Sequence, residues 1–191
     1  MSYIDFFKQF CCEPTVVGAI APSSQKLAER MLERVNFSNA KAIVEFGPGT
    51  GIFTRNIMQN LNSETVFFAL ELNKKLNSIV TQAATGALIY NDSATEISKY
   101  LDKHNLSCAD SVISGLPWAA FTDELQTEIL SATVDSLAPN GTFSTFAYLH
   151  GLILPAGKRF KRKLLENFSK VELSPIVWKN CPPAIVYWCV K

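Results

Sequence analysis

A glycine-rich loop with an acidic residue near its start is the strongest chemical signal in the sequence. It reads VEFGPGTG over residues 44–51 and contains Glu45, Phe46, Gly47, Gly49, Thr50 and Gly51. Glycines let a backbone turn tightly and approach a ligand without a Cβ in the way. The helix expected after the loop offers free N–H groups to a carboxylate. The loop therefore predicts a nucleotide-type ligand at the carboxyl end of the first strand of an α/β sheet.

Two more acidic residues stand at the ends of the next two expected strands. Glu71 closes an apolar run over residues 65–71, and Asp92 follows a short run over residues 87–90. Because the carboxyl ends of parallel strands lie along one edge of a sheet, both side chains are expected beside the glycine loop. There Glu71 can accept hydrogen bonds from both hydroxyls of a ribose, and Asp92 can meet the amino group of an adenine. A nucleotide dehydrogenase also carries a glycine loop, but its spacing is G-x-G-x-x-G rather than GPGTG.

The elements that must position these residues alternate between apolar runs and helical patterns, which is typical of an α/β domain with right-handed crossovers. Strands are expected over residues 41–46, 65–71, 87–90, 108–114 and 142–148, and helices over 50–61, 73–83, 92–103, 122–137 and 158–168. A turn is expected over residues 138–141, where proline and glycine stand close together.

Further elements are expected at both ends of this unit. Two closing strands bracket the sequence Cys181-Pro182-Pro183; joined by a short turn, they add an antiparallel edge and bring the sheet to seven strands. Two amphipathic helices are expected before the unit, over residues 2–11 and from Ser23 or Ser24 to Val35.

Together with Glu71 and Asp92, the glycine loop resembles the class I S-adenosylmethionine-dependent methyltransferase family over roughly residues 38–150. The resemblance implies a Rossmann-like α/β fold with a mostly parallel seven-stranded sheet, an antiparallel edge strand and helices on both faces. It also implies S-adenosyl-L-methionine as the cofactor, with its methionine part near Glu45. The predicted cofactor contacts are Glu45, Phe46, Gly47, Gly49, Thr50, Gly51, Glu71, Leu72, Asp92, Ser93 and Ser114. We expect a single domain over residues 1–191, with an N-terminal helical segment over 1–37 and a catalytic core over 38–191.

The segment after the fourth strand faces the transferable methyl group in this fold, and here it reads Ser114-Gly115-Leu116-Pro117-Trp118. Enzymes that methylate exocyclic amines of adenine carry Asn or Asp at the position of Gly115 and, at the position of Trp118, an aromatic ring that stacks on the base. Since Gly115 has no side-chain acceptor, base methylation loses its usual chemistry. The backbone carbonyls of Gly115 and Leu116 could still orient an amine, and Pro117 and Trp118 are expected against the acceptor.

Four segments in the same order extend the resemblance to nearly the whole chain. They are VGAIAPSS over residues 17–24, EFGPGTG over 45–51, SGLP over 114–117 and VWKNCPPAIV over 177–186. On these segments the chain resembles the bacterial phospholipid N-methyltransferases. This resemblance implies successive methylation of a lipid headgroup amine, typically that of phosphatidylethanolamine, while similar enzymes act on ornithine-type lipids.

An amine acceptor must lose its proton before transfer, because an alkylammonium has no lone pair. Desolvation lowers the pKa of an ammonium, and a positioned acceptor can take the proton. Tyr148, which ends the fifth strand, and His150 are the candidates for this role. The alternatives are that Tyr148 lies at the rim of the core and that His150 is an ordinary loop residue. Tyr3 and Phe7 are the predicted substrate contacts on the apolar face of the first helix.

Two segments are candidates for contact with an anionic membrane. The apolar stripe of residues 3–11 either packs as a lid over the cofactor cleft or lies in a bilayer interface. For the bilayer interface it supplies only one positive charge, Lys8. Residues 158–163 read KRFKRK, and these five basic residues either meet anionic headgroups or form a solvated helix face. The expected location is cytoplasmic, with peripheral attachment to the inner face of the membrane.

Composition and charge narrow the alternatives. A formal net charge of +1 gives no global field toward nucleic acid, so together with the missing Asn it speaks against an rRNA adenine methyltransferase, and no nucleic-acid partner is expected. Five scattered cysteines and two histidines do not suit a zinc site, so no metal is expected. No apolar run approaches the roughly 18 residues of a membrane span, and no signal peptide is recognised. Two alternative functions are not excluded: an N-methyltransferase of small-molecule amines and a non-catalytic cofactor-binding protein. The sequence does not determine the oligomeric state.

Overall fold

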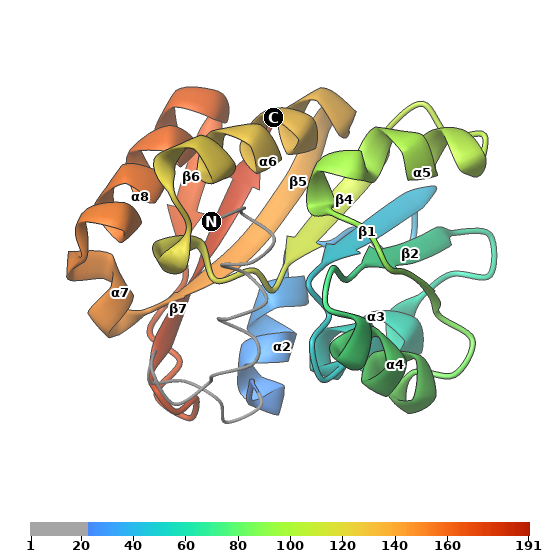
Figure 1. The fold of residues 1–191 in the computed structure, drawn as a ribbon, viewed down its shortest axis with the longest axis horizontal. Coiled ribbons are helices and arrows are strands. Elements are labelled where there is room, and N and C mark those ends of the chain that lie inside the picture. Colours follow the sequence, from blue (N-terminus) through green and yellow to red (C-terminus); the bar gives the residue numbers. More distant parts are fainter. Residues whose placement is uncertain (1–22) are drawn as a thin grey trace.

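Seven strands form one sheet in the computed structural model, which describes residues 23–191 (Figure 1). The strands are β1 (Ala42–Phe46), β2 (Val66–Leu70), β3 (Leu88–Tyr90), β4 (Ala109–Ser114), β5 (Leu137–Tyr148), β6 (Lys170–Leu173) and β7 (Ala184–Val190). Their order in the sheet is β3-β2-β1-β4-β5-β7-β6. The first five strands run parallel, whereas β7 pairs antiparallel with β5 and with the edge strand β6. The predicted mostly parallel sheet with an antiparallel edge is confirmed.

Strand β1 lies inside the sheet, and all five of its residues are buried. The chain proceeds to β2 on one side of β1 and reaches β4 on its other side. Such a reversal of direction opens a crevice beyond the carboxyl end of the strand, which is where ligands bind in sheets of this kind. The glycine loop begins at this point.

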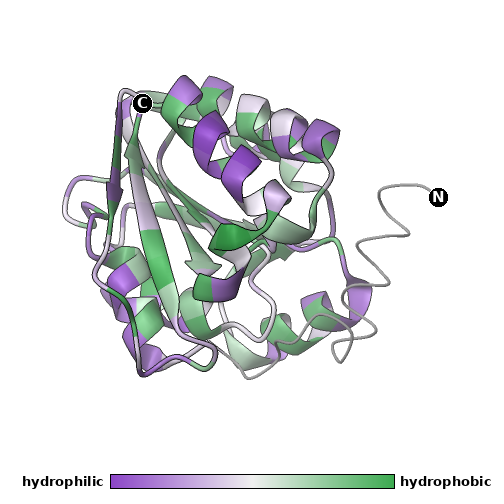
Figure 2. Cartoon of the chain, turned by 90° about the vertical axis from the view of Figure 1, so that its left-hand side faces the viewer, coloured by the Kyte–Doolittle hydropathy of each residue, from purple (hydrophilic) through white to green (hydrophobic). Residues whose placement is uncertain are grey.

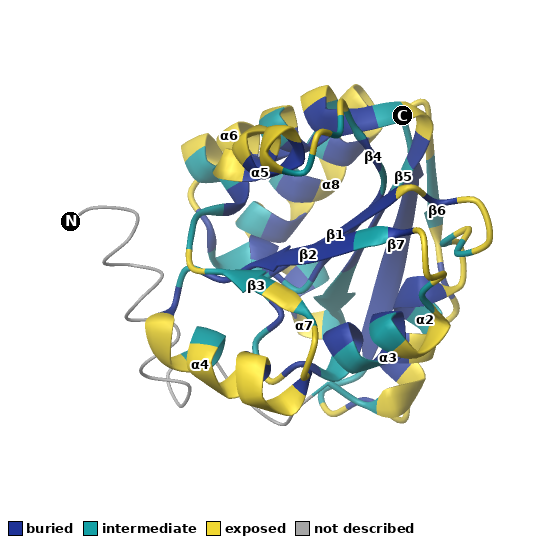
Figure 3. Cartoon of the chain, turned by 90° about the vertical axis from the view of Figure 1, so that its right-hand side faces the viewer, coloured by how far each residue is buried: buried dark blue, intermediate teal, exposed yellow. Residues whose placement is uncertain are grey.

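Helices cover both faces of the sheet, as predicted. They are α2 (Gln25–Leu32), α3 (Ile52–Asn60), α4 (Lys74–Ala83), α5 (Ile97–Lys103), α6 (Asp123–Ser136), α7 (Leu149–Ile153) and α8 (Pro155–Asn167), with short 3₁₀ turns η2 (Ala94–Glu96) and η3 (Trp118–Ala120). Helices α2, α3 and α4 lie on one face, and α5, α6 and α8 lie on the other (Figure 1). One apolar core lies under α2 and α3, and a second lies under α5, α6 and α8. Figure 3 shows the buried strands between helices whose outer faces are exposed.

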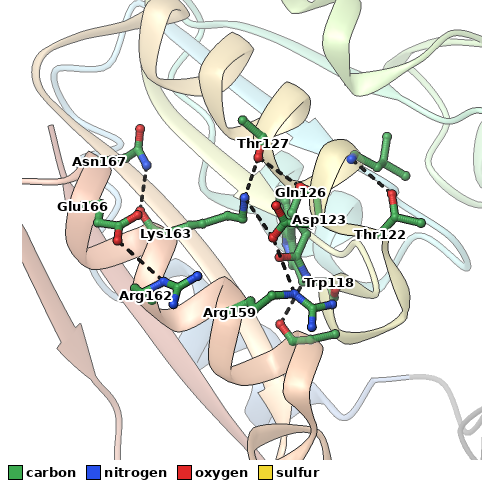
Figure 4. A network of polar contacts seen from close by, with 12 residues as sticks. Trp118, Thr122, Asp123, Gln126, Thr127, Arg159, Arg162, Lys163, Glu166 and Asn167 are labelled. Atoms are coloured by element: carbon green, nitrogen blue, oxygen red, sulfur yellow. Dashed lines mark hydrogen bonds and ion pairs between the residues drawn. The ribbon is translucent and has the colours of Figure 1, made fainter.

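A polar network joins helices α6 and α8 to the segment that follows β4 (Figure 4). Gln126 of α6 is buried, and its Nε2 donates to the backbone carbonyls of Trp118, at 2.8 Å, and Ala156, at 3.3 Å. Asp123, at the start of α6, forms ion pairs with Arg159 and Lys163 of α8. These contacts fix η3, and therefore the segment after β4, against two helices.

Several boundaries differ from the predicted ones. Strand β5 begins at Leu137, and the predicted turn over residues 138–141 forms a bulge within it, because the pairing with β4 jumps between Leu137 and Thr142. Helix α7 was not predicted, and α8 begins at Pro155 rather than at residue 158. The predicted short turn between the last two strands is wrong. The connection runs over residues 174–183, and Val177 in it forms a bridge to Ala184.

Of the two predicted N-terminal helices, the second lies within the described residues. Ser24 caps α2 as predicted, since its Oγ accepts a hydrogen bond from the Leu27 N–H at 3.1 Å, although the helix ends at Leu32 rather than at Val35. The predicted helix over residues 2–11, with Tyr3 and Phe7, lies outside the described residues.

Candidate active site

The glycine loop after β1 is interlocked with the segment after β4. Gly47 has a positive φ of 64°, and a Cβ on it would stand 2.8 Å from Cδ2 of Leu116. Gly115 donates its N–H to the carbonyl of Phe46 at 2.7 Å, and a Cβ on it would stand 2.5 Å from the carbonyl oxygen of Gly47. Gly47 is therefore favoured by its positive φ, and Gly115 is required by the close approach of the Gly47 backbone, so an Asn at position 115 would not fit this arrangement.

Glu71 joins the loop to the end of β2. Its side chain is buried; Oε2 accepts from the Gly49 N–H at 3.2 Å, and Oε1 accepts from the Asn73 N–H at 2.9 Å. Desolvation by burial raises the pKa of Glu71, while the two N–H donors act in the opposite direction. The predicted neighbourhood of Glu71 and the glycine loop is present in the structure.

Glu45 is a completely buried carboxyl group one strand away. Its Oε2 accepts from the Thr54 hydroxyl at 2.7 Å, while its Oε1 has no hydrogen-bond partner. Burial, with a smaller contribution from the charge of Glu71, raises the pKa of Glu45 to about 8. A buried oxygen without a partner is unfavourable, so Glu45 is suited to receive a donor from a ligand.

Asp92 lies after β3 in a half-exposed position and already has donors. Its Oδ2 accepts from Lys99 Nζ at 2.8 Å and from the Tyr100 hydroxyl at 2.9 Å, and its Oδ1 accepts from the Ser93 N–H at 2.9 Å. Desolvation alone would raise the pKa of Asp92, but these hydrogen bonds outweigh it and hold the pKa below its usual range. The Tyr100 ring is in turn stacked on Tyr90, with ring centroids 4.2 Å apart. Asp92 is thus ionised and held in one place.

The segment after β4 holds Ser114 and Trp118 in the interior, whereas Trp118 was predicted to lie against the acceptor. Both are buried, and Trp118 Nε1 donates to Ser114 Oγ at 3.1 Å. The indole stacks on the Phe160 ring of α8, with centroids 4.4 Å apart and planes 15° apart. A ring this buried offers no face to a substrate, so the predicted stacking of Trp118 on an acceptor is corrected to packing between β4 and α8. Pro117, between them, is half-buried.

Tyr148 and His150 lie together where β5 ends. Their rings stack with centroids 5.6 Å apart and planes 8° apart, and Phe146 meets Tyr148 edge-on at 5.3 Å. Tyr148 is half-buried and His150 is exposed. Burial raises the pKa of Tyr148, so its hydroxyl stays protonated at neutral pH. This tyrosine can donate or accept a hydrogen bond but does not supply a phenolate.

The remaining predicted contacts differ in exposure. Phe46 is buried in the core, Thr50 is exposed, and Leu72 and Ser93 are half-buried. Thr54, Lys99 and Tyr100 were not predicted. They lie on the helices that follow the loop and Asp92, and a search for donors seven to nine residues beyond each acidic residue would have found them. The described residues contain no group of three or more His, Cys, Asp or Glu side chains that could hold a metal ion.

Comparison with known proteins gives one sequence relative of nearly equal length. The chain is 26% identical over 187 residues to an ornithine lipid N-methyltransferase of Singulisphaera acidiphila, and the match covers 96% of this chain and 93% of that protein. No family model matches the chain.

Solved structures of methyltransferases share the fold. The N-methyltransferase NodS from Bradyrhizobium japonicum has a TM-score of 0.66 at 12% identity and covers 87% of this chain, which spans 95% of that structure. An O-methyltransferase from Bacillus cereus in complex with SAH has a TM-score of 0.67 at 12% identity and covers 98% of this chain, which spans 89% of it. At these identities the likeness concerns the fold alone. It is the fold expected from the glycine loop.

Proposed function

We propose that this chain, which has the fold of class I S-adenosylmethionine-dependent methyltransferases, transfers methyl groups to the amine of a lipid headgroup. The sequence relative with this activity on ornithine lipid matches over nearly the whole of both chains, which supports a lipid amine as the acceptor. Phosphatidylethanolamine and an ornithine lipid both present such an amine. The acceptor class is therefore part of the proposal, and its two members are separated by experiment.

The residues around the glycine loop suit S-adenosyl-L-methionine, which supplies a methyl group on a positively charged sulfonium. Glu45 has a buried oxygen without a partner, and we assign it to the ammonium group of the methionine part. Glu71 is held at the loop by the Gly49 N–H, and we assign it to the ribose hydroxyls. Asp92 is ionised and fixed by Lys99 and Tyr100, and we assign it to the adenine amino group.

The burial of Trp118 is the observation that favours an aliphatic amine over a nucleobase. A base acceptor needs an exposed aromatic face for stacking and a side-chain acceptor for its amine. Here Trp118 packs on Phe160, and Gly115 cannot be replaced by a larger residue without a clash against Gly47. Among the described residues, this edge offers an acceptor backbone carbonyls and the Tyr148 hydroxyl, which suit a small amine on a flexible chain.

In the proposed mechanism the chain aligns the amine and receives its proton. Alignment alone provides much of the acceleration of a displacement at an already activated carbon. A backbone carbonyl, of Gly115 or Leu116, and the Tyr148 oxygen accept hydrogen bonds from two of the three N–H groups of the ammonium, which leaves the third proton to be removed. His150, stacked on Tyr148 and exposed to solvent, takes the proton from the acceptor and passes it to water. Tyr148 therefore orients the acceptor, and His150 is the proposed general base.

Purified protein with S-adenosyl-L-methionine carrying a labelled methyl group tests this function. Phosphatidylethanolamine, an ornithine lipid and soluble amines such as ethanolamine are offered separately, and Asp92→Ala protein serves as the control with weakened cofactor binding. We expect label in at least one lipid and mass increments of one or more CH₂ units in lipids from cells that express the protein. Label in soluble amines alone would replace the lipid by a small-molecule acceptor, and transfer to none of them would refute the proposal.

A further inference from the structure

In the described part of the protein, the exposed apolar residues are concentrated in one part of the chain. Among the described residues, eight large apolar side chains are exposed, and six of them lie between residues 153 and 178. These six are Ile153, Leu154, Leu165, Leu173, Ile176 and Trp178, of which Ile153 and Trp178 are 72% and 69% exposed. They belong to α7, α8, β6 and the segment after β6. Such a concentration of apolar surface marks a contact site more often than chance.

The same stretch carries an excess of positive charge. Residues 153–179 contain seven Lys or Arg and two Glu, a net charge of +5 in a chain whose net charge is +1. Leu154, the N-cap residue of α8, and Lys158, Lys161 and Leu165 on the helix follow the spacing i, i+4, i+7 and i+11, so they form one stripe along it. Lys158 and Lys161 are exposed and take part in no ion pair within the described residues.

The other basic residues of α8 are engaged with acidic partners. Arg159 and Lys163 pair with Asp123 of α6, and Arg162 pairs with Glu166. The predicted cluster over residues 158–163 thus divides into one flank bound to α6 and another flank facing away from it. Figure 2, in which this side of the molecule faces the viewer, shows apolar and polar turns next to each other along α7 and α8.

This surface borders the acceptor edge of the sheet. Helix α7 follows Tyr148 directly, and its first N–H, on Leu149, donates to the carbonyl of Pro183 at 3.0 Å. Tyr148 pairs with Ala184, which on its other side bridges to Val177, the residue before Trp178. Ile153 and Trp178 therefore belong to two segments joined by hydrogen bonds at the end of β5.

We propose that the surface formed by α7, the Leu154–Lys158–Lys161–Leu165 stripe of α8 and the β6 edge through Trp178 binds an anionic lipid bilayer. A tryptophan and aliphatic side chains enter a bilayer interface, while lysines beside them meet anionic headgroups. A second copy of the chain suits the surface less, since two faces of net positive charge would repel each other. The inference deepens the proposed function, because bilayer attachment here sets the acceptor edge beside the lipid headgroups.

Vesicle binding by the full chain tests the surface separately from catalysis. The vesicles contain phosphatidylcholine alone or phosphatidylcholine mixed with phosphatidylglycerol, neither of which has an amine that can be methylated. Wild-type protein is expected to cosediment with the anionic vesicles and to be released by high salt. Lys158→Gln with Lys161→Gln should lower binding about thirtyfold, and Ile153→Ser with Leu154→Ser should lower it at least about tenfold.

Matched controls lie at the opposite edge of the sheet. Ile79 and Leu88 are 49% and 46% exposed, so Ile79→Ser with Leu88→Ser removes similar apolar exposure, and Lys74→Gln with Lys75→Gln removes similar charge. Both controls should bind vesicles like wild type, and thermal melts identify any variant that fails to fold. Unchanged binding in both test variants overturns the proposal. An equal loss of vesicle binding in the control variants also overturns it. A third overturning result is a wild-type protein that does not bind vesicles and forms a dimer that the Ile153 and Leu154 substitutions dissociate.

Failure of the surface and failure of the proposed function give different results. If the surface is correct, the test variants lose methylation of lipid in vesicles but keep methylation of the same lipid dispersed in detergent. If wild-type protein binds anionic vesicles and methylates no lipid, the proposed function fails and the surface stands.

Discussion

Three acidic side chains at the carboxyl edge of the sheet occupy three electrostatic environments. Glu45 is buried with one oxygen unpartnered, Glu71 is buried with two backbone N–H donors, and Asp92 is half-exposed with Lys99 beside it. Burial raises the pKa of the first two, and hydrogen bonds lower the pKa of the third. Acidic residues at neighbouring strand ends are thus suited to different partners. Glu45 is a protonated acid, whereas Asp92 is a carboxylate held in one place.

At Asp92 we predict that the Tyr100 hydroxyl positions the carboxylate for adenine. Tyr100→Phe removes that donor but keeps the ring stacked on Tyr90. Cofactor affinity should fall about threefold to tenfold, as for loss of one typical hydrogen bond, and Asp92→Ala should reduce it further. Calorimetry with S-adenosylhomocysteine and with its analogue lacking the adenine amino group provides the measurement. An equal loss for both ligands would remove Tyr100 from adenine recognition.

Gly115 is predicted to be irreplaceable on steric grounds. Gly115→Ala places a Cβ 2.5 Å from the Gly47 carbonyl oxygen, so the glycine loop must shift. We expect a loss of about 1–3 kcal/mol in the free energy of unfolding together with at least a tenfold loss of cofactor affinity. Gly151→Ala is the matched control, because its new Cβ would meet only the Ala119 Cβ at 3.6 Å. Urea melts and calorimetry on both variants decide the point; equal behaviour would mean that the loop adapts freely.

At the scale of elements, local features were predictable and long-range contacts were not. The ends of β1, β2 and β3 follow from apolar runs of a few residues, so Glu45, Glu71 and Asp92 could be placed from the sequence. The orientation of Trp118 could not, because it depends on Phe160, which lies on a helix far along the chain. Helix α7 was missed because its five residues, LHGLI, form an apolar run with a glycine and no cap. The Val177 bridge likewise depends on a partner beyond the cis peptide bond between Cys181 and Pro182.

Gln126 is predicted to hold α6, α8 and the segment after β4 together. Gln126→Leu removes the donor to the Trp118 and Ala156 carbonyls, and the buried Trp118 carbonyl then loses this hydrogen bond. The free energy of unfolding should fall by about 1–3 kcal/mol. Gln59→Leu, at an exposed position on α3, is the control and should change it by less than about 0.5 kcal/mol. If urea melts show the two substitutions to be equivalent, the network contributes nothing to stability.

At the scale of the whole molecule, the proposed cofactor residues and the proposed acceptor residues lie over different strands of the sheet. The glycine loop, Glu71 and Asp92 lie over β1, β2 and β3, whereas Tyr148 and the exposed apolar surface lie at β5, β7 and β6. The segment after β4 stands between them because β4 lies between β1 and β5. The topology therefore places Gly115 between the residues proposed to bind the cofactor and those proposed to orient the acceptor.

The stability of the whole molecule is predicted to depend on the pH through Glu45. Its pKa is raised from 4.5 to about 8, so between these values the unfolded chain is ionised while the folded chain keeps the proton. The folded state then binds more protons, and stability must fall as the pH rises through this window, by at most about 1.4 kcal/mol per pH unit. Above it both states are ionised and the loss is complete. Glu71 contributes with the same sign, because its pKa is also raised.

Glu45→Gln keeps the shape of the side chain but removes the ionisable group. The variant should therefore be more stable than wild type at pH 8, and its stability should fall less between pH 5 and pH 8.

An ammonium group bound beside Glu45 favours its ionised form. S-adenosylhomocysteine should therefore displace a proton from the wild type near neutral pH and raise its Tm more at pH 8 than at pH 6. Calorimetry in buffers of different ionisation enthalpy measures the released proton, and Glu45→Gln should release none. Equal proton release from both proteins would show that the ligand's ammonium group does not meet Glu45.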